Sequence, residues 1–243
     1  MTDHVLILGS APNAVEAAQW DHTLFDRIVV INNAWRVRSD WDILIHPEDF
    51  PEDRRPDKLA QGQIVVTAAD YVPLQNDHGG FVYAGGTMAL TAGYWALAAL
   101  RPKVMAFMGC DMVYPDSGKS HFYGTGEADP LRADISLRNL EAKSARLALH
   151  AARLGCACVN LSSNPSRLVF DRATPEALGD VAHLPDRIAQ RACVAPEAIE
   201  KQLGYMVESG RYWEVQSQFN ADEIDALDRL WLQCHRSAMV ALA

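Results

Sequence analysis

Short apolar runs alternate with longer helical patterns along the first two thirds of the chain. Helices are predicted near 14–19, at 86–100, where the Ala- and Leu-rich run is too long for a strand, and at 134–154, which is amphipathic. Strands are predicted at 4–8, 27–31, 42–46, 63–67, 103–108 and 156–161. This alternation predicts an α/β fold of Rossmann-like type, with a mostly parallel sheet and helices on both of its faces.

The pattern changes near residue 172, where the strand-like runs end. Residues 195–209 and 220–241 are predicted to be helical, with Pro196 in the first turn of the former helix. Asn220 and Glu223 form the N-cap and capping-box pair of the latter helix. The sequence thus divides into a sheet domain, residues 1–171, and a C-terminal helical appendage, residues 172–243.

The last helical pattern has one apolar face at helical spacing. This face is formed by Ile224, Leu227, Leu230, Trp231 and Cys234. Two interpretations remain open: the appendage packs back on the sheet domain, or it forms a homo-oligomer through these helices.

Composition narrows the classes of protein that fit. The net charge of −9 argues against a nucleic-acid binder, which normally carries a basic stripe, but it permits an anionic small ligand held by backbone N–H groups. No apolar run approaches the about 18 residues of a membrane span, and the first apolar run is too short for a signal peptide. The five cysteines are odd in number, and Cys156 and Cys158 are expected to be packed thiols. These features predict a cytoplasmic protein without a membrane span.

The first candidate for chemistry is the turn after the first strand. Its residues are Gly9, Ser10, Ala11, Pro12 and Asn13, and they open a helix. Backbone N–H groups in such a turn can bind a phosphate or a ribose. The stretch has neither the G-x-G-x-x-G pattern nor a P-loop, and a plain strand–turn–helix connection fits it equally well.

Two further turns offer polar groups. Asn32 and Asn33 follow the second strand, where their amides can bind a base or ribose or can cap the next turn. Gly86 and Thr87 open the helix at 86–100 and can hold a phosphate or carboxylate at its N-terminus. The structural alternative for the second turn is that Thr87 only caps the helix.

The strand at 103–108 ends in Gly109 and Asp111, and a polar loop with His121 follows. An imidazole is suited to removing a proton near neutral pH, although a histidine in a polar loop is more often a surface group. Tyr114 and Tyr123 are candidates for donating hydrogen bonds to a leaving phosphate. Near the third strand, His46, Glu48 and Asp49 would suit a metal, but their spacing matches no familiar site.

The order of these turns resembles the sialyl motifs of sialyltransferases. Residues 9–50, with GS-x-x-N, VVINNAW and WDILIHPEDF, are similar to the large motif, and residues 85–124 to the small motif and the His-Tyr element after it. Bacterial sialyltransferases share this layout, as does a related group of unknown or pterin-linked proteins with a Gly-x-Gly-Pro-Ser turn. The resemblance covers about residues 4–165 and leaves the appendage unexplained.

The resemblance implies a transferase that moves a sialic-acid-type sugar from a CMP-sugar to a glycan hydroxyl. Such enzymes invert the anomeric carbon and use no metal or other cofactor. The sheet domain would then bind the nucleotide-sugar, and His121 would be the general base, with Tyr114 or Tyr123 at the leaving phosphate. The residues implied to bind the nucleotide and its phosphate or the sugar carboxylate are Gly9, Ser10, Ala11, Pro12, Asn13, Asn32, Asn33, Gly86, Thr87, Gly109 and Asp111.

The sequence departs from the animal members of that family. Val30 stands where they have an arginine, and only Cys110 lies in a motif region, so their disulfide has no counterpart. Ala11 replaces a common second glycine, which leaves donor specificity open. Two alternatives remain: a magnesium- and ATP-dependent diphosphate transfer to a pterin, using Asp111 with Glu48 and Asp49, and a non-catalytic nucleotide-binding or assembly protein.

Overall fold

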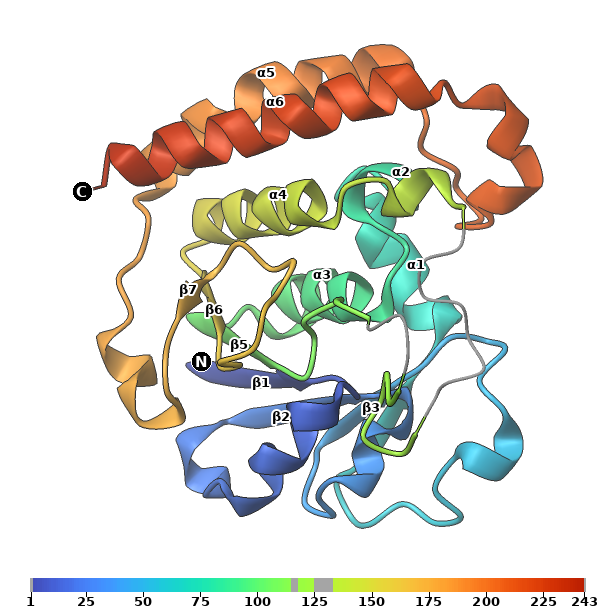
Figure 1. The fold of residues 1–243 in the computed structure, drawn as a ribbon, viewed down its shortest axis with the longest axis vertical. Helices are drawn as coiled ribbons and strands as arrows, with labels where there is room; N and C mark the ends of the chain where they lie inside the picture. Colours follow the sequence, from blue (N-terminus) through green and yellow to red (C-terminus); the bar gives the residue numbers. More distant parts are fainter. Residues whose placement is uncertain (1, 115–117, 125–132, 243) are drawn as a thin grey trace.

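The computed structural model describes residues 2–114, 118–124 and 133–242. These residues form a seven-stranded sheet, parallel throughout, in the order β4-β3-β2-β1-β5-β6-β7 (Figure 1). The strands are β1 (His4–Leu8), β2 (Arg27–Ile31), β3 (Ile43–Ile45), β4 (Ile64–Val66), β5 (Val104–Met108), β6 (Ala157–Asn160) and β7 (Asp171–Arg172). The predicted α/β class with a parallel sheet is confirmed.

The helices only partly follow the predicted boundaries. The predicted helix at 134–154 divides into a 3₁₀ turn and an α-helix, and the one near 14–19 is entirely 3₁₀. The α-helices are α1 (Ala68–Asn76), α2 (Phe81–Ala84), α3 (Met88–Leu100), α4 (Leu140–Arg153), α5 (Asp186–Leu203) and α6 (Ala221–Val240). The 3₁₀ helices are Pro12–Gln19, His22–Leu24, Asn32–Arg36, Glu52–Arg54, Ile135–Leu137, Pro175–Asp180 and Tyr212–Gln218.

The central strands β1, β2, β3 and β5 are buried and apolar over most of their length, because both faces of the sheet are covered there. In β1, Val5 and Ile7 point to the face that carries α3 and α4, and they pack there with Leu90 and Leu147. Leu6 and Leu8 point to the other face, which the 3₁₀ helix Pro12–Gln19 and neighbouring segments cover. The predicted two-sided covering is therefore present, with 3₁₀ rather than α structure on the second face.

The strand order creates a break in direction at β1. The chain proceeds from β1 outward through β2 and β3 to β4, and then returns to place β5 on the opposite side of β1. The connections that follow β1 and β5 therefore leave the sheet in opposite directions. In parallel sheets such a switch point opens a crevice outside the carboxyl ends of the strands, where ligands bind.

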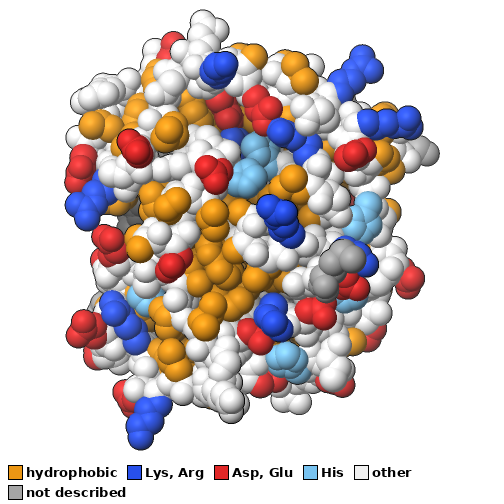
Figure 2. Space-filling view, turned by 180° about the vertical axis from the view of Figure 1, so that it is seen from behind, with side chains coloured by type: hydrophobic (Ala, Val, Ile, Leu, Met, Phe, Trp, Pro, Cys, Tyr) orange, Lys and Arg blue, Asp and Glu red, His pale blue; other side chains and the backbone are white. Residues whose placement is uncertain are grey.

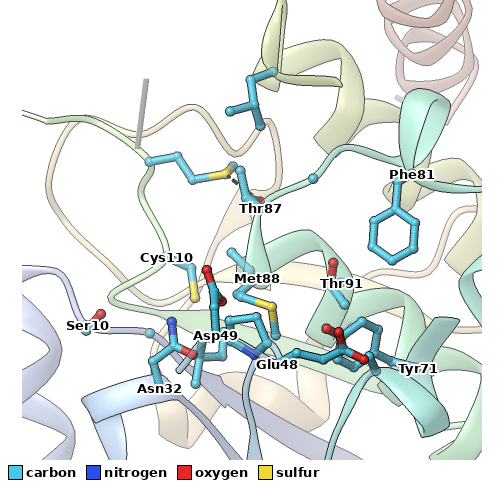
Figure 3. A pocket seen from close by; sticks show the side chains of 18 of the residues that line it. Ser10, Asn32, Glu48, Asp49, Tyr71, Phe81, Thr87, Met88, Thr91 and Cys110 are labelled. Atoms are coloured by element: carbon cyan, nitrogen blue, oxygen red, sulfur yellow. Dashed lines mark hydrogen bonds between the residues drawn. The ribbon is translucent and has the colours of Figure 1, made fainter. Parts of the chain in front are cut away.

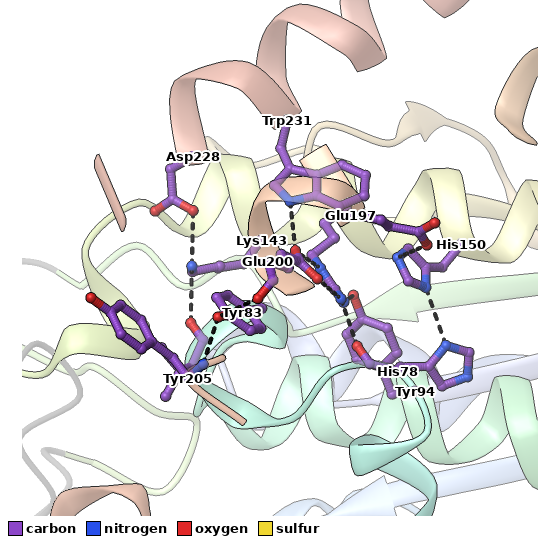
Figure 4. A network of polar contacts seen from close by, with 12 residues as sticks. His78, Tyr83, Tyr94, Lys143, His150, Glu197, Glu200, Tyr205, Asp228 and Trp231 are labelled. Carbon is purple, nitrogen blue, oxygen red and sulfur yellow. Dashed lines mark hydrogen bonds and ion pairs between the residues drawn. The ribbon is translucent and has the colours of Figure 1, made fainter. Parts of the chain in front are cut away.

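The C-terminal helices form an outer layer over α4 (Figure 1). Ile224, Leu227 and Trp231 of α6 are buried in a cluster that includes Leu149 of α4. The apolar face predicted for the last helix thus packs back on the sheet domain. A buried ion pair also connects α4 and α6: Lys143 Nζ of α4 lies 2.8 Å from Asp228 Oδ1 of α6 (Figure 4).

Two details of the helical appendage differ from expectation. Pro196 lies inside α5, which begins at Asp186, so the prediction that this proline marks a first turn is wrong. The Asn220 side chain caps α6 by accepting from the N–H of Asp222, as predicted. The Glu223 carboxylate, however, accepts a hydrogen bond from the Tyr205 hydroxyl.

Figure 2 shows the opposite face of the molecule, where hydrophobic side chains gather near the centre and acidic and basic side chains intermingle around them. Among the helices that the structure describes, none combines the length and apolarity needed to cross a membrane. All five cysteines lie within the described residues, and each is a free thiol.

Candidate functional site

A cavity of about 500 Å³ opens at the carboxyl ends of β1, β2, β3 and β5, at the switch point of the sheet (Figure 3). Its walls also include α1, the starts of α2 and α3, the loop at 118–124 and residues 209–213 of the appendage. The predicted site residues that line it are Gly9, Ser10, Ala11, Asn32, Gly86, Thr87, Gly109, Tyr114 and His121. Its volume is typical of a small-molecule site.

The floor of this cavity is made of backbone. The N–H of Gly9 donates to Met108 O at 2.8 Å, and that of Ala11 donates to Gly109 O at 3.0 Å. A Cβ on Gly9 would lie 2.3 Å from the carbonyl oxygen of Gly109, and Gly109 itself has a φ of +67°. Glycine is therefore required at both strand ends, because the turns after β1 and β5 touch each other.

Asn32 lies in a left-handed conformation, with φ +51°, directly after β2. Its side chain lines the cavity (Figure 3), and its Oδ1 is buried without a hydrogen-bond partner among the described residues. Met112, another lining residue, has a φ of +53°. Strained backbone of this kind and an orphaned buried acceptor are typical of binding sites. Asn33 is also buried, and its Oδ1 has no hydrogen-bond partner in the described part of the chain, but this residue lies outside the lining.

Asn13 and Asp111 meet in a buried network beside the cavity rather than in its lining. Asn13 Nδ2 donates to Asp111 Oδ2 at 3.2 Å and to Ser162 Oγ at 2.7 Å, and Ser162 Oγ donates to Asp111 Oδ2 at 2.7 Å. Asn160 Nδ2 donates to Asp111 Oδ1 at 3.3 Å. The network fastens the turn after β1 to the ends of β5 and β6. Pro12, the first residue of the 3₁₀ helix, also lies outside the lining.

The start of α3 borders the middle of the cavity. The Gly86 N–H donates to Ser136 Oγ at 3.1 Å, so this amide already has a partner. Thr87 caps the helix by accepting from the N–H of Leu90 at 3.3 Å, and its hydroxyl donates to Met112 Sδ at 3.4 Å. Met88, the first residue of α3, lines the cavity. The N-terminal end of α3, where the helix dipole is positive, therefore lies at the cavity.

His121 reaches the cavity through a tight turn. The N–H of Phe122 donates to Ser10 O at 3.0 Å, which docks the loop on the turn after β1. His121 is half-buried, its Nδ1 lies 2.8 Å from Ser120 Oγ, and burial lowers the pKa of its imidazole. The imidazole is therefore neutral near pH 7, the form that can accept a proton.

The two predicted tyrosines differ in position. The Tyr114 ring lies 6.3 Å from that of His121 and lines the cavity, and burial raises the pKa of Tyr114 to about 12, which keeps its hydroxyl protonated. Tyr123 stacks on His121 at 5.0 Å but is 40% exposed and lies outside the lining. Tyr114 is thus the tyrosine placed to donate a hydrogen bond to a ligand.

The sequence did not reveal the far side of the cavity. Tyr71 of α1, Phe81 of α2 and residues 209–213 line it, and Figure 3 places Tyr71 and Phe81 opposite Ser10 and Asn32. The only signal in the sequence is the run Arg211-Tyr212-Trp213, which puts two aromatic residues between helices. Its place in the site depends on contacts between segments more than 100 residues apart.

The described residues do not assemble the carboxylates expected for magnesium. Glu48 and Asp49 line the cavity, but both oxygens of Asp111 accept hydrogen bonds in the network described above. Within the described part of the chain, one group has three metal-type ligand atoms close together: His150, Cys193 and Glu197. This group lies on α4 and α5, outside the cavity lining, and Arg153 pairs with its glutamate.

The fold and the cavity together define an α/β protein with a small-molecule pocket at the switch point of a parallel sheet. No protein-family model matches the chain, and no curated protein or solved structure matches it either.

Proposed function

We propose that this protein is a sialyltransferase-like glycosyltransferase, which moves an acidic sugar from a CMP-sugar to an acceptor hydroxyl without a metal. One observation carries the proposal: the imidazole of His121, whose pKa burial lowers, lines the same cavity as the turn after β1 and the side chain of Asn32. These are the groups to which the resemblance to sialyl motifs assigns the base and the nucleotide.

The chemistry follows from these positions. His121 accepts the proton of the acceptor hydroxyl as its oxygen attacks the anomeric carbon of the donor. The bond from that carbon to the phosphate oxygen breaks, and CMP leaves with the electron pair. Tyr114, held protonated by its raised pKa, donates a hydrogen bond to the leaving phosphate. Attack from the face opposite the leaving group inverts the anomeric carbon.

The nucleotide would lie on the backbone floor between β1 and β5. The Asn32 side chain lines the cavity, and its amide group can exchange hydrogen bonds with a base or with a ribose hydroxyl. The amide-rich start of α3 supplies positive potential for the phosphate or the sugar carboxylate. Neither contribution needs a net positive chain, which fits the charge of −9.

Calorimetry with CMP and with CMP-sialic acid tests the proposal directly. The purified chain is expected to bind both, and release of CMP from the donor is expected in the presence of an acceptor or, slowly, of water. His121→Ala should keep nucleotide binding and lower the rate of CMP release by about 10²–10⁴-fold, the usual contribution of a general base. His183→Ala, at an exposed histidine, serves as the matched control.

Absence of cytidine nucleotide binding by the wild-type chain would overturn the proposal. Binding with a normal rate in His121→Ala would leave a nucleotide site but remove the assigned base. Magnesium-dependent ATP binding in place of CMP binding would favour the diphosphate-transfer alternative.

A further inference from the structure

Residues 209–213 of the appendage form a fixed wall of the cavity. The Asn76 Nδ2 group of α1 donates to Glu208 O at 2.7 Å. Gly210, with φ +74°, lies so close to α1 and α2 that a Cβ would be 3.0 Å from Val72 and 3.1 Å from Phe81. Arg211 Nη2 lies 3.5 Å from Glu48 Oε2, after β3. The appendage therefore reaches across to both sides of the pocket mouth.

The same wall is anchored to the start of α3. The Tyr212 hydroxyl donates to Asp134 Oδ2 at 2.7 Å and lies 3.0 Å from Ser136 Oγ. Ser136 Oγ in turn accepts from the N–H of Gly86 at 3.1 Å. This chain of buried contacts links the appendage to the turn that borders the middle of the cavity, so the wall has one defined position.

Aromatic rings cover this side of the cavity. Tyr71 and Phe81 meet edge to face at 6.3 Å, Phe81 stacks on Tyr212 at 6.2 Å, and Tyr212 meets Trp213 at 5.5 Å. Trp213 is 57% exposed although it lines the cavity. A large indole left open to solvent beside a pocket is a surface available to a ligand with a flat apolar face.

Two carboxylates line the cavity beside these aromatic rings. Glu48 and Asp49 line the cavity between the aromatic side and the Ser10–Asn32 side (Figure 3), and Glu48 is 68% exposed while pairing with Arg211. Carboxylates accept hydrogen bonds from hydroxyl groups, and their negative charge disfavours an anionic ligand. The chemistry of this side therefore differs from that of the N-terminal end of α3, whose helix dipole suits a phosphate.

We infer that the aromatic wall, with Trp213 at its open end, is the acceptor subsite and takes a neutral pyranoside. The C–H face of the sugar ring lies on the indole, and its hydroxyl groups donate to Glu48 and Asp49. The role of this subsite as the acceptor site rests on the proposed transfer reaction. Binding of a neutral sugar to the aromatic wall does not depend on that reaction. The appendage, outside the region that resembles sialyl motifs, then selects the acceptor.

Binding to the wall is tested first without a nucleotide. Saturation-transfer NMR of the full chain with methyl β-glucopyranoside, methyl β-galactopyranoside and glucuronic acid should show contact for the neutral sugars and weaker contact for the acid. Trp213→Ala should weaken the signal severalfold, and Trp213→Phe, which retains a ring, should keep most of it. Thermal unfolding of both variants should match the wild type, because the indole is largely exposed.

Binding of CMP to the same variants separates this inference from the proposed function. Trp213→Ala should leave the Kd for CMP unchanged and raise the KM for a neutral acceptor about 3- to 10-fold, as expected for the loss of one aromatic contact. If wild-type protein binds the sugars but not CMP, the proposed function fails and the sugar site stands. Weakened CMP binding in Trp213→Ala would mean that the wall holds the base, and an unchanged sugar signal would mean that the wall holds no ligand. Either result overturns the inference.

Discussion

Arg146 of α4 and Glu200 of α5 form a two-point ion pair inside the protein: both N–O distances, Nε to Oε1 and Nη2 to Oε2, are 2.8 Å. Both side chains are buried, and the indole N–H of Trp231 also donates to Glu200 Oε1 at 2.8 Å (Figure 4). The pair therefore fastens the helical appendage to the layer that covers the sheet.

Glu200→Ala should destabilise the protein by about 3–5 kcal/mol, because it leaves the Arg146 charge buried without its partner. Urea unfolding followed by circular dichroism measures the change. Asp225→Ala is the matched control, since it breaks the exposed pair with Arg138 and should cost less than about 1 kcal/mol. Equal losses in the two variants would contradict the role given to the buried pair.

Gly86→Ala should lower the free energy of unfolding by about 1–3 kcal/mol, the usual cost of forcing an atom into a packed site. Its Cβ would lie 2.5 Å from the Tyr212 hydroxyl and 2.6 Å from Ser136 Oγ. Gly179→Ala, where no atom lies within 4 Å of the new Cβ, should be nearly neutral. Thermal denaturation compares the two, and a neutral Gly86→Ala would show that the wall can shift.

Stability should fall as the pH is lowered from about 6.5 towards 5. Burial, assisted by the charge of Arg146, lowers the pKa of His78 to about 4 and that of His150 well below its usual value. Below pH 6.5 the unfolded chain binds protons that the folded chain does not, so each histidine contributes a loss of up to about 1.4 kcal/mol per pH unit. His78→Gln should flatten this slope in urea unfolding, whereas exposed His183→Gln should leave it unchanged.

The pH profile of CMP release provides a separate test of His121. Its pKa is lowered by burial, so if His121 is the proposed base it is already neutral at pH 7 and the rate should be level there. Below the lowered pKa, the imidazole is protonated and the rate should fall with a slope of one on a logarithmic plot. His121→Ala should lose this acid limb. An acid limb that persists in the variant would assign the base to another group.

Strands β1 to β6 were predictable because they are short apolar runs between turns, and α3 because its run is too long for a strand. Strand β7 was missed, because it consists of two exposed polar residues, Asp171 and Arg172. Helix α1 was not predicted: it carries Pro73 in its interior and has no clear apolar stripe. Pro196 misled the prediction in the opposite way, because a proline normally marks a helix start but here is tolerated inside α5.

The sequence predicted one side of the cavity better than the other. Gly9, Asn32 and His121 could be found because polar or glycine residues at strand ends gather at one edge of a parallel sheet. Asn13 and Asp111 were grouped with these residues in the sequence analysis. Their contacts with Ser162 and Asn160 were missed, because the end of β6 lies far from both residues in the sequence and no local pattern links it to them. Trp213 and Arg211 were missed for the same reason.

The touching backbones of Gly9 and Gly109 have a consequence for how this pocket can change. A side chain at either position would collide with the other turn, so the floor can vary only if both strand ends are rebuilt together. Part of the wall is less constrained: Arg211 and Trp213 are exposed, whereas Gly210 and Tyr212 beside and between them are packed in place. An engineer who wants a new ligand specificity should therefore vary Arg211 and Trp213 and leave the strand-end glycines untouched.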